Sequence, residues 1–143
     1  MMPSNVGEIM SKNVIAVKES ETLADVLQLM MEHDFRHVPV VNDEKSLVGI
    51  ISERDLLRTC VTEDDIEIAG AERAYFLSDH PVTEIMSTNP ETVEQESTLS
   101  DACQVMLENK FGCVPVVDSG RLVGILTTTD ILKEIIRRDI QGV

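Results

Sequence analysis

Aromatic residues are scarce in this chain: they make up 3% of its 143 residues, and tryptophan is absent. A packed interior must therefore be built from aliphatic side chains. The cysteines, Cys60, Cys103 and Cys113, are odd in number and form no CxxC pair, so neither a disulfide framework nor a zinc knuckle is expected. No apolar run is long enough to span a bilayer, and the N-terminus lacks the pattern of a signal peptide. We expect a soluble, cytoplasmic protein without a membrane partner.

Positively charged residues are also few in this chain. Twelve Lys and Arg face 26 Asp and Glu, which gives a formal net charge of −14. Such a charge repels phosphate backbones, so nucleic-acid binding is not expected. A small anion can still bind in a locally positive pocket, and the few cations near any motif therefore carry information.

The sequences of known catalytic and metal-binding motifs are missing too. No HExxH, GxSxG or P-loop pattern occurs, and no nucleophile or acid–base pair stands out. His33 and His37 are four residues apart, but His37 begins a predicted strand, so a metal pair on one helix face is not expected. The sequence favours a non-enzymatic protein without a metal site.

What the chain does contain is one unit written twice. Residues 49–55 read GIISERD and residues 124–130 read GILTTTD, and the segments before them repeat in the same order. Each copy has a short helical turn (VGEIMS or VTEIMS), a short strand, a helix with apolar residues at helical spacing, a Val-rich hairpin and a closing helix. Pro39 and Pro115 lie inside the hairpin strands, which predicts a sheet edge or a bulge at each.

The repeat predicts a mixed α/β (α+β) fold, in which two β-α-β-β-α repeats pack sheet to sheet with pseudo-twofold symmetry. Units of this size are marginal alone, which favours burial of one sheet against the other. We expect the first domain at residues 6–61, a partly helical acidic connector at 62–81 and the second domain at 82–141. The predicted long helices are 22–34, 98–110 and 128–140, with a shorter one at 53–60.

The repeated hydroxyl-x-x-Asp motif has two interpretations. Ser52 with Asp55, and Thr127 with Asp130, fit a helix-capping box in which Asp replaces the usual Glu or Gln. A helix start after a strand also presents backbone N–H groups that suit a phosphate, and an Asp one turn in can accept both hydroxyls of a ribose. Gly49 and Gly124 would let the backbone approach a ligand closely. The two interpretations are not exclusive.

The doubled pattern resembles a tandem pair of CBS domains, named after cystathionine β-synthase, in a stand-alone CBS-domain protein. The resemblance covers residues 6 to about 140. It is carried by IMS near each start, IAV and ETV in the short strands, TLADVLQLM and TLSDACQVM, HVPVV and CVPVV, LVGIIS and LVGILT, and Asp55 and Asp130. The whole set occurs twice in the same order, which makes the resemblance specific.

The resemblance implies a regulatory module with clefts between the repeats that bind adenine nucleotides (AMP, ADP or ATP) or S-adenosylmethionine. No cofactor would be required. Asp55 and Asp130 would bind the ribose, Ser52 and Thr127 would face the phosphate, and the backbone at Ile15, Ala16, Glu91 and Thr92 would hold adenine. The pocket walls would come from Phe35, Arg36, His37, Phe111, Gly112 and Cys113. Family members commonly form homodimers, and ligand binding would be signalled to a regulated protein.

The two copies differ in charge near the motif. The first has Arg36, His37 and Arg54, which can meet a phosphate, where the second has Gly112, Cys113 and Thr129. We therefore expect unequal sites, and a cleft that combined Asp130 with Arg36 and His37 would be the better phosphate site. Surface charges exposed to solvent remain an alternative for the arginines. The alternative function is a structural or protein-interaction module with no nucleotide ligand, in which both Asp residues only cap helices.

Overall fold

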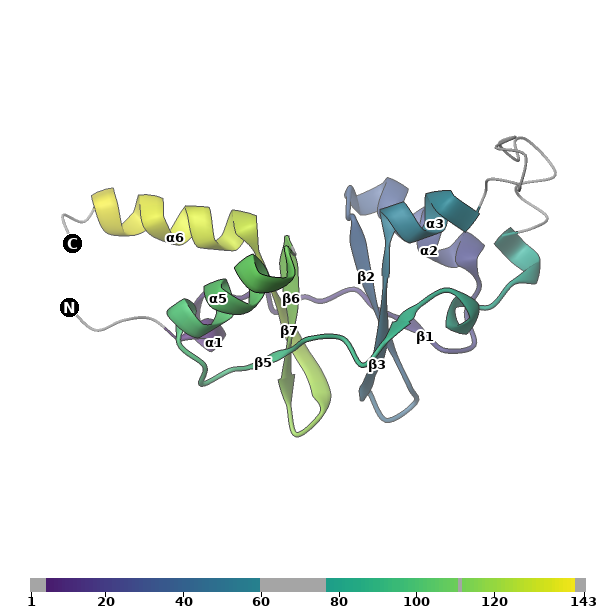
Figure 1. Ribbon diagram of the computed structural model, residues 1–143, viewed down its shortest axis with the longest axis horizontal. Coiled ribbons are helices and arrows are strands. Elements are labelled where there is room, and N and C mark those ends of the chain that lie inside the picture. Colours follow the sequence, from purple (N-terminus) through teal and green to yellow (C-terminus); the bar gives the residue numbers. More distant parts are fainter. Residues whose placement is uncertain (1–4, 60–76, 111, 141–143) are drawn as a thin grey trace. The chain divides into compact units, whose positions relative to one another are not determined.

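A computed structural model describes residues 5–59, 77–110 and 112–140 of the chain. The chain divides into two compact units. Ile15–Pro90 forms one, called here the Asp55 unit; Met1–Val14 and Glu91–Val143 form the other, called the Asp130 unit. Each combines helices with a sheet of its own, which confirms the predicted mixed α/β class with two sheets (Figure 1). The predicted connector falls largely on residues 60–76, outside the described residues.

The sheet of the Asp55 unit has four strands in the order β1-β2-β3-β4. They are β1 (Val17–Lys18), β2 (His37–Val41), β3 (Leu47–Ser52) and β4 (Ser87–Thr88). β1 pairs with β2 in parallel, and the other two pairs are antiparallel. β2 and β3 form the predicted hairpin. β4 was not predicted as a strand, since Ser87 and Thr88 are polar and the segment is only two residues long.

The described helices of the Asp55 unit include α2 (Leu23–His33) and α3 (Glu53–Thr59), together with a 3-10 turn, η1 (Val82–Glu84), and residues 77–79 are helical as well. α2 begins at a capping box: the Asp25 N–H donates to Thr22 Oγ1 (3.4 Å), and the Thr22 N–H donates to Asp25 Oδ2 (2.9 Å). Aliphatic side chains from helices and strands fill the core, as the scarcity of aromatic residues required. They include Leu23, Val26, Val38, Val40, Ile51, Leu56 and Val82, all at most 1% exposed.

The Asp130 unit repeats this plan with a three-stranded sheet in the order β5-β6-β7. Its strands are β5 (Val93–Glu94), β6 (Cys113–Asp118) and β7 (Arg121–Thr127). Its helices are α1 (Val6–Ile9), α5 (Leu99–Asn109) and α6 (Thr128–Ile140). β5 pairs in parallel with β6, and β6 pairs antiparallel with β7. None of the helices in the described part of the chain has the length and apolarity that crossing a bilayer requires.

The proline-containing strands each carry a bulge, which was one of the two predicted alternatives, but neither is an edge strand. In β2, an inner strand, the bulge falls between Val40 and Val41, one residue beyond Pro39. The arrangement is tolerated because β1 is so short: it pairs only with Val40 and Val41, so no strand faces Pro39 on that side. The missing N–H of Pro39 therefore costs no ladder hydrogen bond there. In the same way β5 pairs only with Val116 and Val117, so no strand faces Pro115 on the β5 side, while Pro115 pairs with Ile125 on the other side.

The two short segments that precede the repeats are exchanged. We call residues 6–11 the first leading segment and residues 82–87 the second leading segment. The first belongs to the Asp130 unit, where the Val6 N–H donates to the Ser97 carbonyl (2.9 Å). The second belongs to the Asp55 unit, where the Val82 N–H donates to the Glu21 carbonyl (2.9 Å). Each leading segment thus packs on the repeat that it does not precede, and Val6 and Val82 are both fully buried.

Candidate functional site

Asp55 lies at the junction of β3 and α3. The Asp55 N–H donates to Ser52 Oγ at 3.1 Å, which confirms the predicted capping role of Ser52. Asp55 itself is half-buried, and within the described residues no group donates a hydrogen bond to its carboxylate. A half-buried carboxylate retains about four acceptor positions. Asp55 can therefore accept hydrogen bonds from a bound molecule.

Asp130 makes the fuller set of contacts at the start of α6. The Asp130 N–H donates to Thr127 Oγ1 (3.1 Å), and the Thr127 N–H donates back to Asp130 Oδ2 (3.0 Å). This reciprocal pair confirms the predicted capping box. The Ser11 hydroxyl lies within hydrogen-bonding distance of both carboxylate oxygens of Asp130, at 3.1 and 3.3 Å. Capping and ligand binding remain compatible, because the carboxylate has acceptor positions beyond these contacts.

The start of β2 lies beside the start of α3. The Glu53 N–H donates to the Arg36 carbonyl (2.8 Å), and His37 pairs with Ser52 across the hairpin. Burial lowers the pKa of His37 below 6.5; Asp55 and Glu53 act in the opposite direction, and Arg36 reinforces the effect. The structure therefore brings Arg36, His37 and Ser52 close to Asp55.

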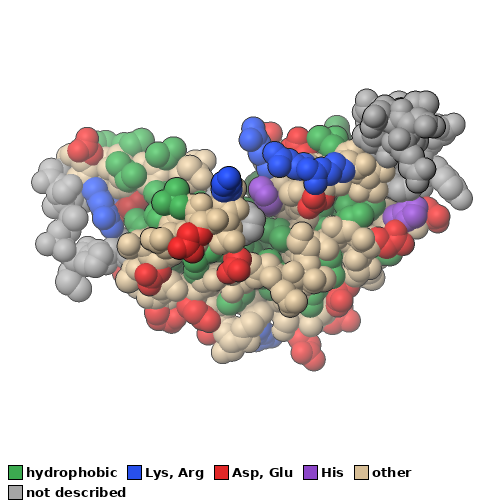
Figure 2. All heavy atoms as spheres, viewed as in Figure 1, with side chains coloured by type: hydrophobic (Ala, Val, Ile, Leu, Met, Phe, Trp, Pro, Cys, Tyr) green, Lys and Arg blue, Asp and Glu red, His purple; other side chains and the backbone are tan. Residues whose placement is uncertain are grey.

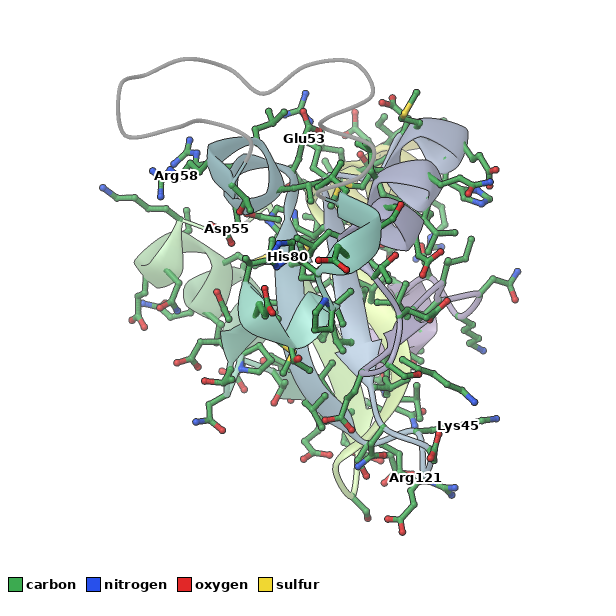
Figure 3. All side chains as sticks on the ribbon, turned by 90° about the vertical axis from the view of Figure 1, so that its right-hand side faces the viewer. Lys45, Glu53, Asp55, Arg58, His80 and Arg121 are labelled. Carbon is green, nitrogen blue, oxygen red and sulfur yellow. The ribbon has the colours of Figure 1, made fainter. Side chains whose placement is uncertain are left out.

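Arginine side chains cluster around this end of the Asp55 unit. Arg36, Arg54 and Arg58 are exposed, and none of them forms a salt bridge with a described residue. Figure 2 shows Lys and Arg side chains gathered near α3, beside a histidine. Asp55 and Arg58 both project from α3 (Figure 3). In a chain of net charge −14, such a cluster is a local concentration of positive charge that can attract an anion.

Among the described residues at the equivalent end of the Asp130 unit, Gly112 and Thr129 replace Arg36 and Arg54, and Lys133 replaces Arg58. Cys113 pairs with Thr127, and the Gly112 carbonyl accepts from the Thr128 N–H (3.0 Å) and the Thr128 hydroxyl (3.2 Å). Burial raises the pKa of the Cys113 thiol to about 11, so that it stays neutral. Phe111, which was predicted to line the pocket, lies outside the described residues.

The predicted adenine-binding residues precede the short parallel strands. Val17 pairs with Val40, so Ile15 and Ala16 come just before the paired part of β1. Glu91 and Thr92 hold the same place before β5, where Val93 pairs with Val116. Phe35 is 36% exposed and stacks on the His33 ring, with centroids 5.2 Å apart. Within the described residues, no hydrogen bond links these five candidate residues to the Asp side chains.

The repeated glycines have a packing role that the sequence did not indicate. A Cβ atom on Gly49 would lie 2.6 Å from Met86 Sδ and 3.0 Å from the Ser87 carbonyl oxygen. At Gly124 the Met10 side chain takes the corresponding space. Each methionine comes from the IMS triplet of a leading segment. The close approach that these glycines allow is therefore to Met10 and Met86, not to a ligand as predicted.

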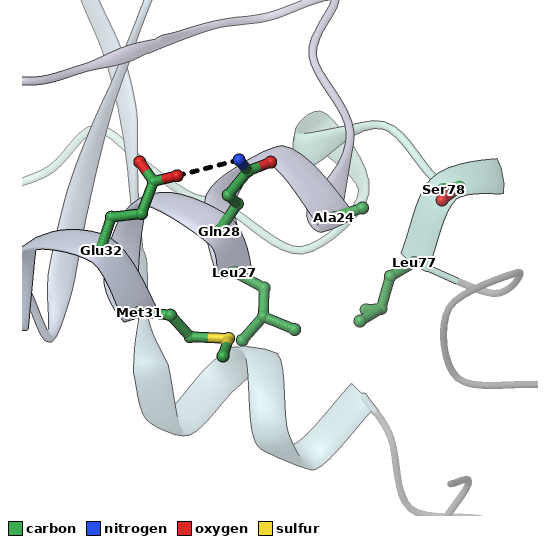
Figure 4. A pocket seen from close by; sticks show the side chains of 7 residues that line it. All are labelled: Ala24, Leu27, Gln28, Met31, Glu32, Leu77 and Ser78. Carbon is green, nitrogen blue, oxygen red and sulfur yellow. Dashed lines mark hydrogen bonds between the residues drawn. The ribbon is translucent and has the colours of Figure 1, made fainter. Parts of the chain in front are cut away.

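A separate apolar groove of about 390 Å³ lies along α2 in the Asp55 unit (Figure 4). Its lining residues are Ala24, Leu27, Gln28, Met31, Glu32, Leu77 and Ser78. Gln28 and Glu32 are joined by a hydrogen bond of 2.9 Å along its edge. None of the predicted ligand-binding residues lines this groove.

Sequence reasoning missed Ser11 as a site residue. The IMS triplet is visible twice, at residues 9–11 and 85–87, but the pattern places each copy with the repeat that follows it. Only the exchange of the leading segments brings Ser11 to Asp130. No local signal in the sequence specifies that exchange.

This chain is similar to known proteins over both repeats. The CBS domain model matches residues 6–62 and 82–137. A CBS domain-containing protein of Dictyostelium discoideum is 32% identical over 133 residues, which cover 92% of this chain and 91% of the relative. Curated relatives differ in length, and the chain spans only 41% of another, which is 33% identical over 129 residues.

Solved structures show the same fold with ligands bound. CBSX2 of Arabidopsis thaliana in complex with AMP is 29% identical, with a TM-score of 0.79 over 95% of this chain and 98% of that one. The CBS domain pair of MJ0100, in complex with 5′-methylthioadenosine and S-adenosyl-L-methionine, is 25% identical, with a TM-score of 0.75 over 96% of this chain and 99% of that one. With two matches to the family model and these structural relatives, the chain belongs to the CBS domain family and carries the domain as a tandem pair.

Proposed function

We propose that this protein is a regulatory module that binds an adenosyl compound through Asp55 and Asp130 and passes the signal to a partner. The observation that carries the proposal is the half-buried Asp55 carboxylate, which accepts no hydrogen bond within the described residues. The two hydroxyls of a ribose can donate to its two oxygens. The AMP complex of CBSX2 and the S-adenosylmethionine complex of MJ0100 support this class of ligand.

The other residues of the proposed site follow from their position. Ser52 Oγ accepts from the Asp55 N–H, which leaves its O–H free to donate to a phosphate or ribose oxygen. Thr127 is placed in the same way relative to Asp130. The backbones at Ile15, Ala16, Glu91 and Thr92 precede the short strands and would bind adenine, next to Phe35 and Phe111.

The difference in charge between the two units favours different ligands at Asp55 and at Asp130. Arg36, His37 and Arg54 lie near Asp55, and Gly112, Cys113 and Thr129 replace these three residues in the Asp130 unit. The phosphate of AMP, ADP or ATP offers more negative charge to an arginine than S-adenosylmethionine does, because the single carboxylate of S-adenosylmethionine is accompanied by a sulfonium and an ammonium. Wherever these arginines meet a ligand, we expect AMP, ADP or ATP to be preferred.

A homodimer is the assembly that the exposed apolar residues support. Met31 on α2 and Leu107 on α5 occupy equivalent places in the two repeats, and they are 76% and 77% exposed. Leu57 on α3 and Leu132 on α6 form a second equivalent pair, at 51% and 54%. Apolar side chains exposed at matching positions suit a self-complementary contact with a second copy. Ile135, Ile136 and Ile140 extend the apolar face along α6.

Calorimetric titration with AMP, ADP, ATP and S-adenosylmethionine tests the proposal. Asp55→Asn and Asp130→Asn keep the size of the side chain and remove its charge. Binding should weaken by at least about tenfold in the variant whose site is used, equivalent to about 1.4 kcal/mol. Asp43→Asn is the matched control, because Asp43 is a turn residue whose side chain is 94% exposed. Titration of wild type will also show which of the four compounds is preferred.

The alternative function is a protein-interaction module without a nucleotide ligand. The capping bonds of Ser52 and Thr127 are the observation that favours it, because they give both motifs a structural role. If folded wild-type protein binds none of the four compounds, this alternative replaces the proposal, and the search moves to a protein partner. Loss of binding in Asp55→Asn or Asp130→Asn, with the fold intact, would exclude it.

A further inference from the structure

Ser11 reaches the ligand motif of the Asp130 unit from the other end of the sequence. Its backbone is fixed on β7: the Ser11 N–H donates to the Ile125 carbonyl, and the Ile125 N–H donates to the Ser11 carbonyl. Met10 beside it packs over Gly124. With its backbone held, Ser11 retains one relevant freedom, the rotation of its hydroxyl about the side-chain bond.

The Ser11 hydroxyl lies between the two oxygens of the Asp130 carboxylate. Its Oγ is 3.1 Å from Oδ1 and 3.3 Å from Oδ2, so it faces the side that the two oxygens share. The Thr127 N–H contacts Oδ2 as well. A ribose diol that donates one hydroxyl to each oxygen needs the same shared side. Ser11 and the diol therefore compete for it.

The Asp55 unit lacks this contact although it has the equivalent serine. Ser87 pairs with Ile50 on β3, as Ser11 pairs with Ile125 on β7. Within the described residues, however, neither Ser87 nor any other donor contacts the Asp55 carboxylate. The Asp55 carboxylate is therefore open to a ligand, and the Asp130 carboxylate already accepts a hydrogen bond from Ser11.

We propose that Ser11 is an intramolecular competitor for the ribose-binding face of Asp130, and that it makes the Asp55 carboxylate the first to be occupied. The inference rests on the proposed function. A ligand at Asp130 must turn the Ser11 hydroxyl away, which costs the hydrogen bond to the carboxylate. Ser11 thereby lowers the affinity of one site without closing it, and the protein responds to a wider range of ligand concentration.

The test compares Ser11→Ala with Ser11→Thr and Ser87→Ala, each in an Asp55→Asn background that isolates the Asp130 site. Calorimetry with AMP and with S-adenosylmethionine should show about three- to tenfold tighter binding in Ser11→Ala, the worth of one hydrogen bond. Ser11→Thr keeps the hydroxyl and should bind as the background does. Ser87→Ala should also leave the affinity unchanged. The gain should shrink for 2′-deoxy-AMP, which cannot donate two ribose hydroxyls.

Unchanged or weaker binding in Ser11→Ala would overturn the competition; weaker binding would make Ser11 a ligand-binding residue instead. A second readout does not depend on ligand. The carboxylate ¹³C resonance of Asp130 in the free protein should move in Ser11→Ala and stay in place in Ser11→Thr. If the wild-type protein binds no adenosyl compound, the proposed function fails and the competition fails with it. The ¹³C shift then reports separately whether the hydrogen bond exists.

Discussion

Ser11 and Ile125 exchange two backbone hydrogen bonds, from the Ser11 N–H to the Ile125 carbonyl at 2.9 Å and from the Ile125 N–H to the Ser11 carbonyl at 3.0 Å. They are 114 positions apart along the chain. The pairing fixes the first leading segment against β7 and places the Ser11 hydroxyl at Asp130. In the Asp55 unit, Ser87 pairs with Ile50 in the same register.

The glycine beneath each methionine should be intolerant of a side chain. In Gly49→Ala the new Cβ would lie 2.6 Å from Met86 Sδ and 3.0 Å from the Ser87 carbonyl oxygen, and the backbone oxygen cannot move without disturbing β4. We expect the free energy of unfolding to fall by about 1–3 kcal/mol, as in other overpacked sites. Urea denaturation followed by circular dichroism measures it. Gly112→Ala is the control and should be near neutral, because nothing lies within 4 Å of its Cβ position. A neutral Gly49→Ala would contradict this packing role.

The cap of α2 should contribute measurably to stability. Thr22→Ala removes the hydroxyl that accepts from the Asp25 N–H at the start of the helix. The loss should be about 1 kcal/mol, within the range for N-cap substitutions. Urea midpoints of wild type and variant give the difference. Thr83→Ala, at an exposed position of η1, should change stability by less than about 0.5 kcal/mol. Equal effects of the two substitutions would argue against the cap.

Stability should fall in mild acid because of His37. Burial lowers the pKa of His37 below 6.5, so the unfolded chain binds the proton more tightly than the folded chain does. The stabilisation from neutral His37 is complete above pH 6.5 and is lost as the pH falls through the lower folded-state pKa. Asp55 and Glu53 reduce the effect, and Arg36 adds to it. His37→Gln should flatten the dependence of the urea midpoint on pH in this window.

The prediction for His37 has a direct check. NMR titration of the imidazole ring in folded protein should give a midpoint below 6.5. A midpoint above that value would reverse the expected slope, because the protonated ring would then be favoured by the folded state. Parallel pH curves for wild type and His37→Gln would show that other groups determine the acid response.

The apolar face of α6 should mediate self-association. Ile136 is 58% exposed and lies four residues from Leu132 on the same side of the helix. A glutamate at position 136, introduced as Ile136→Glu, would bury charge in a dimer contact and should weaken dimerisation by more than about tenfold. Sedimentation equilibrium measures the constant. Lys133→Glu makes a larger charge change on the same exposed helix and should have a much smaller effect. A wild-type protein that stays monomeric throughout would refute the dimer.

The elements of the fold could be read from local pattern. The predicted helix at 22–34 is found at Leu23–His33, and the last predicted helix matches Thr128–Ile140. These segments combine apolar spacing with a hydroxyl cap, and both signals are local. The hydroxyl and the Asp of each motif were likewise placed correctly at a helix start. Because the same pattern occurs in both repeats, two segments of the sequence supported each of these predictions.

What the sequence could not predict is non-local. VGEIMS and VTEIMS are nearly the same peptide, so their local preferences cannot distinguish one sheet from the other. The sheet on which each leading segment packs depends on the connectivity of the whole chain. A six-residue segment carries no information about that connectivity. Ser11 at Asp130 and Met86 over Gly49 follow from that connectivity, and so both were missed. The inner position of the strand that contains Pro39 could not be predicted for a related reason: the length of the neighbouring strand β1 decides whether an N–H at position 39 is needed.

The exchange of leading segments has a consequence for any attempt to cut the protein in two. A fragment that ends after the first repeat keeps a leading segment whose docking site has been removed, and it lacks Val82–Glu84 and β4, which complete its own sheet and core. The complementary fragment would lose Val6 and Met10 from its core. The two repeats are therefore separate in the sequence, but each needs the leading segment of the other to complete its fold. Mixed together, the two fragments could regain their missing parts only by binding each other.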